Sequence, residues 1–256
     1  KILGIYDNLR TPFQSRMGER IVNSKTDTCT TQYNMSQKRG TRPAVELPDI
    51  SELQRSIKEC VHYIFHRERS RIPIKRIELS KHLNLICRTT ASQVNRVIIE
   101  ANKILKTSYG YKLVQVDSKS GLQYITVTTE KCKLMPSPYT NVHDRKILVA
   151  ALTHIFMSGA PVKEEEMWKF LKEAGLLEEN DYIGRRLLTT TFTRQMYLQY
   201  TKDGEGDLAR NIFTWGQRAV EEVPKMYLLG KMAEAFGKSP DHWSEQFKEA
   251  NEEVEN

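Results

Sequence analysis

The sequence predicts an α+β, mostly helical fold that consists of two winged-helix units in tandem, followed by extra C-terminal helices. Three segments with apolar residues at helical spacing precede two β-rich runs that a short polar loop joins, and this order returns further along the chain. A stretch with Pro136-Ser137-Pro138 separates the two copies. Three helices followed by a hairpin is the element order of a winged helix, a helix-turn-helix with a β wing.

The 256 residues divide into five predicted segments. We expect residues 1–47 to be disordered, because this polar segment holds too little apolar surface to offset the entropy lost on ordering. The first unit, winged-helix A, is expected at 48–130 and is followed by a linker at 131–142. The second unit, winged-helix B, is expected at 143–250 together with the C-terminal helices, and 251–256 form an acidic tail.

Local signals place the elements of winged-helix A. Asp49 with an acid three residues later is typical of a helix start, and apolar residues recur at helical spacing up to Phe65. Pro73 prevents this helix from continuing. The remaining elements expected in this unit are a short helix at about 76–83, a helix that Thr89 or Thr90 caps and Gly110 ends, and a hairpin of 111–116 and 122–128.

Winged-helix B repeats these signals. Asp144 is expected to cap its first helix, and Gly159-Ala160-Pro161 to end it. The other predicted elements are a second helix that ends at Gly175, a third helix from about Arg185 to Met196, strands at 197–201 and 211–215, and two closing helices at about 224–236 and 240–249.

Composition narrows the class of protein. Lysine and arginine number 39 against 32 aspartate and glutamate, and the formal net charge of +7 is compatible with a polyanionic partner without requiring one. The longest apolar run is far shorter than the roughly 20 residues of a membrane span, and no apolar segment typical of a signal peptide opens the chain. None of the four cysteines forms a C-x-x-C pair, which favours reduced intracellular thiols over a zinc ribbon or RING domain.

We find no motif typical of catalysis. The sequence has neither a phosphate-binding G-x-x-x-x-G-K-[ST] loop nor a G-x-S-x-G nucleophile elbow. His62 and His66 lie one helical turn apart without an evident third ligand, so we expect no metal and no cofactor. The acidic run Glu164-Glu165-Glu166 fits a helix N-terminus, where the helix dipole favours negative charge. The sequence therefore predicts a protein that is not an enzyme.

Several short motifs resemble the MAGE homology domain family. They occur in the family's order across about residues 50–250: Ile72-Pro73-Ile74-Lys75-Arg76, Gly110-Tyr111-Lys112-Leu113, Tyr197-Leu198-Gln199-Tyr200, Phe213-Thr214-Trp215-Gly216, Arg218-Ala219 and Lys225-Met226. The chain departs from the family at Gln217, where proline is usual, and at Ile64-Phe65, where leucines are typical. Within the family, the segment 238–243 resembles the MAGE-type members of the SMC five–six genome-maintenance complex, its third non-SMC elements.

This resemblance implies a non-catalytic, nuclear and chromosome-associated scaffold that joins two protein partners. The first partner is a RING-type ubiquitin ligase, the first non-SMC element, and the expected contacts are Val61, Ile64 and Phe65. Any role of the scaffold in ubiquitin ligation would be stimulation of this partner. Whether Ile64 and Phe65 belong to the core or to the interface stays open at this point. The second partner is a kleisin, the fourth non-SMC element, in a hydrophobic groove of winged-helix B. The residues expected in that groove are Met226, Tyr227, Leu228, Leu229 and Ala233.

The resemblance also implies binding of double-stranded DNA through winged-helix B. In a helix-turn-helix the recognition helix presents its N-terminal residues to the groove, and arginine and threonine side chains bind phosphate oxygens. The expected DNA contacts on this helix and on the wing are Arg185, Arg186, Thr189, Arg194, Lys202 and Arg210. Because these are backbone contacts, we expect binding without sequence specificity, although a solvated helix face explains the same residues.

Two further questions remain open from the sequence. The basic loop after the first helix, with Arg67, Arg69 and Arg71, is either solvated or an auxiliary contact for DNA or an acidic protein. Alternative functions are a MAGE-type adaptor of another RING ubiquitin ligase and a sequence-specific winged-helix transcription regulator.

Overall fold

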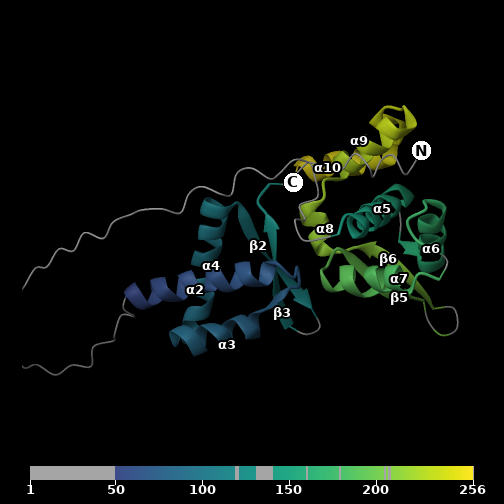
Figure 1. The fold of residues 1–256 in the computed structure, drawn as a ribbon. Helices are drawn as coiled ribbons and strands as arrows, with labels where there is room; N and C mark the ends of the chain where they lie inside the picture. Colours follow the sequence, from purple (N-terminus) through teal and green to yellow (C-terminus); the bar gives the residue numbers. More distant parts are fainter. Residues whose placement is uncertain are drawn as a thin grey trace, which may run out of the picture.

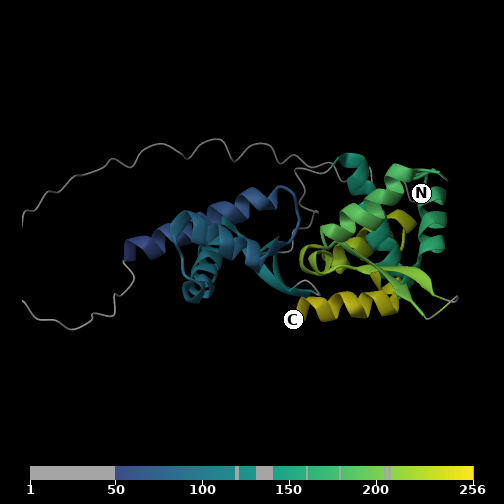
Figure 2. The same ribbon diagram turned by 90° about the horizontal axis from the view of Figure 1, so that it is seen from below.

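The computed structural model describes residues 50–118, 121–130, 141–159, 161–178, 180–204, 206 and 209–255. The disorder expected for 1–47, most of the predicted linker and the tips of both hairpins lie outside these residues. The described residues form two units side by side, each with a small sheet and helices packed on it (Figure 1). The view from below shows α10 running along winged-helix B, at the end of the chain (Figure 2).

Winged-helix A has three helices and a three-stranded sheet. Its elements, in chain order, are α2 (Ile50–Glu68), β1 (Ile74–Lys75), α3 (Arg76–Cys87), α4 (Ala91–Ile104), the π-helix η1 (Leu105–Tyr109), β2 (Tyr111–Ser118) and β3 (Gly121–Thr128). The sheet is antiparallel in the order β1-β3-β2, with Ile74 opposite Tyr124. Thr90 is the N-cap of α4, and Gly110 ends the helical segment with a left-handed φ of 69°.

Winged-helix B repeats this order and adds helices after its hairpin. Its elements are α5 (Val142–Ser158), β4 (Val162–Lys163), α6 (Glu164–Glu173), α7 (Tyr182–Arg186), the π-helix η2 (Leu187–Phe192), β5 (Leu198–Asp203), β6 (Arg210–Trp215), α8 (Gln217–Glu222), α9 (Lys225–Phe236), the 3₁₀-helix η4 (Pro240–His242) and α10 (Ser244–Glu255). The sheet has the order β4-β6-β5. The α+β, mostly helical prediction of tandem winged helices is therefore confirmed.

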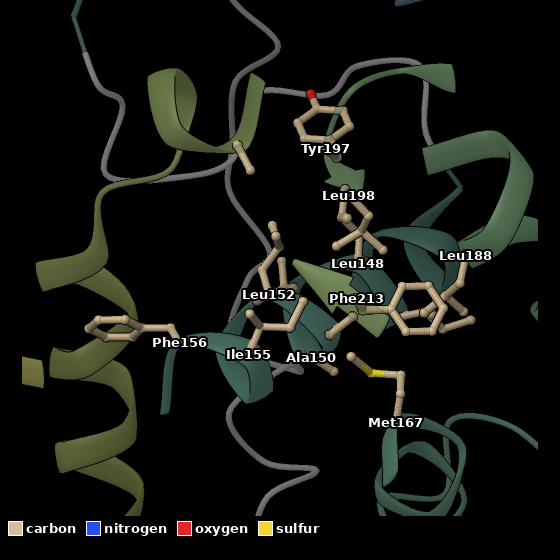
Figure 3. Packing of buried hydrophobic residues seen from close by; sticks show 14 of the residues in the cluster. Leu148, Ala150, Leu152, Ile155, Phe156, Met167, Leu188, Tyr197, Leu198 and Phe213 are labelled. Carbon is tan, nitrogen blue, oxygen red and sulfur yellow. The ribbon is translucent and has the colours of Figure 1, made fainter. Parts of the chain in front are cut away.

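Each unit has its own hydrophobic core. The core of winged-helix A is built mainly by α2, α3 and α4, with Ile64, Leu79 and Val97 fully buried. In winged-helix B the apolar α5 lies at the centre, where Leu152 packs with Met167 and Phe213 (Figure 3). The described members of the two clusters do not overlap, so each unit has a core cluster of its own.

Some local predictions were wrong. The N-cap of α5 is Asn141, whose side chain accepts a hydrogen bond from the His143 amide (3.1 Å), so Asp144 lies inside the first turn. The third helix of winged-helix B begins at Tyr182, because Asp181 caps it by accepting a bond from Gly184 N (2.8 Å). The short strands β1 and β4 and the helix α8 were not expected, since two-residue strands and a six-residue helix leave little periodicity in a sequence.

Candidate functional site

The predicted DNA-binding helix presents arginines beside an acidic residue. The Arg185 guanidinium lies 5.0 Å from the centroid of the Trp168 ring, a cation–π contact. The indole N–H of Trp168 donates to Glu164 Oε1 (3.1 Å), while the hydroxyl of Tyr200 and the amide of Asn211 donate to Oε2 (2.7 and 2.8 Å). Strands β5 and β6 thus bind the start of α6, and Trp168 of α6 in turn contacts Arg185 of α7.

The carboxylate of Glu164 remains charged at neutral pH. Partial burial raises its pKa, but hydrogen bonds from Asn211, Tyr200 and Trp168, and the charge of Arg185, together hold the pKa below its usual value. Burial and the bond to this carboxylate raise the pKa of Tyr200 to about 12. The positive charge of Arg185 is therefore partly balanced by a neighbouring acid.

The other predicted DNA contacts are exposed to different degrees. Arg186 follows Arg185 on α7, and Arg194 lies beyond η2; both are exposed. Lys202 of β5 pairs with the neighbour of Arg210 across the hairpin, which brings these two cations near the wing. Arg210 also lies 3.5 Å from Glu165, in an exposed ion pair of the kind that contributes at most about 1 kcal/mol.

Thr189 is less available than the arginines for a hydrogen bond to a phosphate. Its hydroxyl donates to the backbone carbonyl of Arg185 (2.9 Å), so the hydrogen is already used within the helix. Two exposed apolar side chains that were not expected in this region, Tyr182 and Ile183, lie in the first turn of α7. The surface is therefore a cationic face with apolar and acidic neighbours.

The residues predicted to contact a RING partner divide into core and surface. Ile64 is 0% exposed and Val61 is also buried, so both belong to the core of winged-helix A. Phe65 is only half-buried, and its ring lies 4.7 Å from the ring of Tyr109 and 5.9 Å from that of Tyr111. The surface at this end of α2 is thus an aromatic cluster of Phe65, Tyr109 and Tyr111. Tyr111 of this cluster belongs to the sequence motif that begins at Gly110, and Tyr109 directly precedes it.

The residues predicted to contact a kleisin divide in the same way. Leu229 is 0% exposed, and Leu228 and Ala233 are buried in the core of winged-helix B. Met226 and Tyr227 are half-buried and pack against that core. The three buried residues therefore position α9 and are covered in this conformation.

A shallow cavity lies at the start of α9. It has a volume of about 220 Å³, and its lining residues include Phe156, Trp215, Val220, Lys225 and Glu249. Lys225 Nζ lies 5.6 Å from the Trp215 ring centroid and 2.8 Å from Glu249 Oε1. An apolar floor with a charged rim is suited to a side chain of a peptide or helix.

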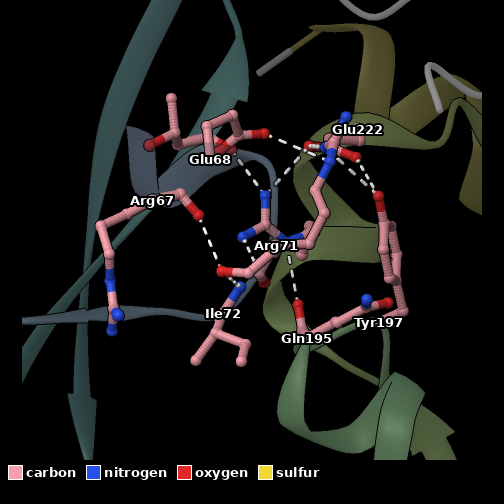
Figure 4. A network of polar contacts seen from close by, with 10 residues as sticks. Arg67, Glu68, Arg71, Ile72, Gln195, Tyr197 and Glu222 are labelled. Carbon is pink, nitrogen blue, oxygen red and sulfur yellow. Dashed lines mark hydrogen bonds and ion pairs between the residues drawn. The ribbon is translucent and has the colours of Figure 1, made fainter. Parts of the chain in front are cut away.

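The sequence did not reveal a buried polar network between the two units. The Arg71 guanidinium donates to Glu222 Oε1 (2.8 Å) and to the hydroxyl of Tyr197 (3.3 Å), and Tyr197 donates to Glu222 Oε2 (2.7 Å), as Figure 4 shows. Arg71 also forms an ion pair with Glu68 (3.2 Å). The interpretation of the whole basic loop as solvated is wrong for Arg71, which is buried because acids of both units surround it.

Arg218 is the second cation of this network. It is 1% exposed, and its Nε donates to the carbonyl of Gln195 (2.8 Å). Its Nη1 donates to the carbonyl of Thr126 (2.6 Å) and its Nη2 to that of Arg71 (3.0 Å), so it binds two backbone carbonyls of winged-helix A from winged-helix B.

The network shifts the ionisation of its members. Burial opposes the charge of Arg71, but Tyr197, Glu222 and Glu68 raise its pKa above the usual value. Burial and the adjacent Glu222 raise the pKa of Tyr197 as well. Arg71 therefore stays charged and Tyr197 stays protonated, which is the state that the observed hydrogen bonds require.

The described residues provide little support for a metal site or a membrane segment. Nowhere in the ranges described do three or more histidine, cysteine or acidic residues gather in a way that suits a metal ion. His82 Nε2 lies 2.7 Å from Glu59 Oε1, whereas His62 is 3.9 Å from the same oxygen. Among the helices that the structure describes, none combines the length and apolar character needed to cross a bilayer.

Relatives of known name resemble this chain over most of its length. It is 29% identical over 223 residues to the human "Non-structural maintenance of chromosomes element 3 homolog", covering 84% of this chain and 71% of that protein. It is 30% identical over 218 residues to human "MAGE-like protein 2", covering 82% of this chain and 17% of that protein. The rat "Melanoma-associated antigen D1" is 29% identical over 210 residues, or 80% of this chain and 27% of that one.

A solved structure has the same fold. One chain of the "Nse1-Nse3-Nse4 complex" superposes with a TM-score of 0.68 at 25% identity, covering 79% of this chain and 99% of that chain. The sequence model of the MAGE homology domain matches residues 60–146 and 135–226, a region that takes in both winged-helix units. This protein therefore belongs to the MAGE homology domain family.

Proposed function

We propose that this chain is a non-catalytic scaffold subunit of the SMC five–six genome-maintenance complex. It bridges a RING-type ubiquitin ligase, the first non-SMC element, and a kleisin, the fourth non-SMC element. It also binds double-stranded DNA without sequence specificity through winged-helix B. The observation that carries this proposal is the likeness to the Nse1-Nse3-Nse4 complex, which extends over 99% of the neighbour's chain.

The share of each relative's length that this chain covers favours this assignment over other MAGE proteins. Identity alone does not discriminate, because it is 29% to the human element 3 homolog and 30% to MAGE-like protein 2. The chain, however, spans 71% of the former and only 17% of the latter. A role as adaptor of another RING ubiquitin ligase is the second candidate, and the nearly equal identities of 29% and 30% are the observation that favours it.

Surface chemistry supports two separate partner contacts. The aromatic cluster of Phe65, Tyr109 and Tyr111 offers large rigid side chains on winged-helix A, which suits a protein interface. The cavity beside α9 offers an apolar floor on winged-helix B for a helix of the kleisin. Because the two surfaces lie on different units, both partners are able to bind at once.

Co-purification with each recombinant partner tests the scaffold role. We expect Tyr109→Ala to weaken retention of the RING partner and Val220→Arg, at the rim of the cavity, to weaken retention of the kleisin. Ile99→Arg, at an exposed apolar position on α4, is the matched control and is expected to retain both. Full retention of both partners by folded Tyr109→Ala and Val220→Arg proteins would contradict the proposed surfaces.

Duplex binding tests the DNA role. Arg185→Glu with Arg186→Glu reverses two charges on α7, and we expect it to weaken binding of a random-sequence duplex at about 0.1 M salt at least tenfold. Arg55→Glu with Arg96→Glu makes the same change in net charge on exposed positions of winged-helix A. If the control lowers affinity as much as the α7 variant does, the contact is not localised to winged-helix B.

A further inference from the structure

The contacts that join the two units are mainly polar. Arg71 of winged-helix A reaches Glu222 and Tyr197, and Arg218 of winged-helix B reaches the carbonyls of Thr126 and Arg71. Lys112 of β2 adds an ion pair with Glu221 of α8 (2.8 Å) at the edge of the joint. Figure 1 places α8 next to the sheet of winged-helix A, and α8 contacts β3.

Most buried apolar residues, in contrast, belong to a cluster within their own unit. One buried cluster runs from Cys60 to Tyr124 and the other from Ile147 to Ala250, and in the described chain they have no member in common. If the joint opened, each unit would keep its core, and the groups newly exposed would include charges that water solvates well. Separation therefore leaves both apolar clusters intact.

The network combines ion pairs inside each unit with polar contacts across the joint. Arg71 pairs with Glu68 inside winged-helix A and Arg218 with Glu222 inside winged-helix B, whereas the Arg71–Glu222 pair (2.8 Å) crosses the joint. Opening the joint would break the crossing pair but leave each arginine with an acid of its own unit, so no buried charge would lose its last partner. The contacts that cross the joint therefore hold the docked orientation, and their loss leaves two units whose own ion pairs are complete.

The backbone of Arg71 adopts an unfavourable conformation at the joint. Its φ of 57° lies in the left-handed region, which residues other than glycine adopt at an energetic cost. In this conformation its side chain enters the joint and its carbonyl accepts from Arg218. The docked contacts therefore hold a conformation that the chain does not favour by itself.

We propose that Arg71, Arg218 and Glu222 form a polar latch that fixes the orientation of the two winged-helix units and whose loss lets the units separate as folded bodies. This inference depends only on this chain and not on its proposed partners. The latch sets the distance between surfaces on winged-helix A and those on winged-helix B. The structure corresponds to the closed state.

Distance measurement on the full chain tests the latch. Cys29, Cys87 and Cys132 are replaced by serine, the buried Cys60 is kept, and spin labels are attached at Arg96→Cys on α4 and Lys169→Cys on α6, both exposed positions. We expect one narrow distance distribution in this parent chain. Arg71→Met and Arg218→Met each remove one guanidinium of the latch, and each is expected to at least double the width of the distribution and to add longer distances.

Folding of each variant is checked independently. All three tryptophans, Trp168, Trp215 and Trp243, lie in winged-helix B, so their emission reports that unit alone. Glu234→Gln, which breaks an exposed ion pair with Lys231 far from the joint, is the matched control and is expected to keep the narrow distribution. A parent-like distribution in either latch variant overturns the proposal. Unfolded tryptophan emission in either variant also overturns it, because a latch is dispensable for the core of winged-helix B.

Discussion

Arg71 of winged-helix A and Glu222 of winged-helix B form an ion pair of 2.8 Å across the joint between the units, with side chains 9% and 1% exposed. Arg218 lies 3.3 Å from the same carboxylate oxygen, so one acid serves two guanidinium groups. A carboxylate removed this far from water requires such partners, because an unpaired buried charge is strongly destabilising. The pair therefore connects the basic loop after α2 to α8, just before α9.

Replacement of Glu222 by glutamine is expected to lower the free energy of unfolding by about 3 kcal/mol, because Arg218 then loses the carboxylate 3.3 Å from it and Arg71 keeps Glu68 alone. Denaturant titration followed by far-UV circular dichroism measures the change. Glu234→Gln, in an exposed pair with Lys231, is expected to change it by less than about 1 kcal/mol. Equal effects of the two substitutions would contradict a special role for the buried acid.

Gly216 is expected to tolerate no side chain. A Cβ atom there would lie 2.2 Å from the carbonyl oxygen of Met196, a backbone atom that cannot rotate away. This close approach lets the Gly216 amide donate to Tyr197 O (2.8 Å) and brings α8, with Arg218, to the joint. Gly216→Ala should therefore lower the free energy of unfolding by more than about 2 kcal/mol.

Gly230 provides the matched control for this substitution. It lies within α9, and a Cβ atom there would meet nothing within 4 Å. Gly230→Ala should stabilise the protein by about 0.5–1 kcal/mol, since alanine loses less chain entropy in a helix. Denaturant titration of both variants distinguishes the two cases, and a Gly216→Ala protein as stable as the parent would show that the backbone shifts freely.

The repeated helix–hairpin order was visible in the sequence because apolar spacing and turn residues are local signals. The joint was not visible, because its partners lie 126 and 151 residues from Arg71 along the chain. Arg71 looked like one more cation of a basic loop, and Arg218 like part of a family motif. In the structure Ile64 and Leu229 are buried, whereas the nearby Phe65 and Tyr227 are half-buried. The sequence could not predict this difference, because neighbouring apolar residues do not indicate which one faces the core.

Cys60 is expected to be unreactive in the folded protein. Burial, and to a smaller extent the nearby Glu59, raise the pKa of its thiol to about 12, so the reactive thiolate is scarce at neutral pH. In a chain whose other three cysteines are serine, Ellman's reagent at about pH 8 should react only after denaturant is added. The half-buried Cys87, restored alone in the same background with Cys60→Ser, should react without denaturant. Fast native reaction of Cys60 would contradict its burial.

Glu164 is expected to make the free energy of unfolding fall at acidic pH. Its pKa is lower in the folded state than the ordinary value of 4.5, so its bonds to Tyr200, Asn211 and Trp168 stabilise the fold above that value. This contribution is lost as the pH falls through the lowered pKa. Between about pH 5 and pH 3 the parent should lose more free energy of unfolding than Glu164→Gln does. Parallel curves for the two proteins would rule out this contribution.

The salt dependence of DNA binding should identify individual phosphate contacts. Each cation that neutralises a phosphate adds about −0.9 to the slope of log K against log salt concentration. Arg186 is exposed on α7, so Arg186→Gln should make the slope shallower by about 0.9 while leaving sequence preference unchanged. Arg210 is paired with Glu165 in the free protein, so Arg210→Gln should change the slope less. Fluorescence anisotropy of one labelled duplex over a range of salt concentrations measures both slopes, and an unchanged slope in Arg186→Gln would remove Arg186 from the interface.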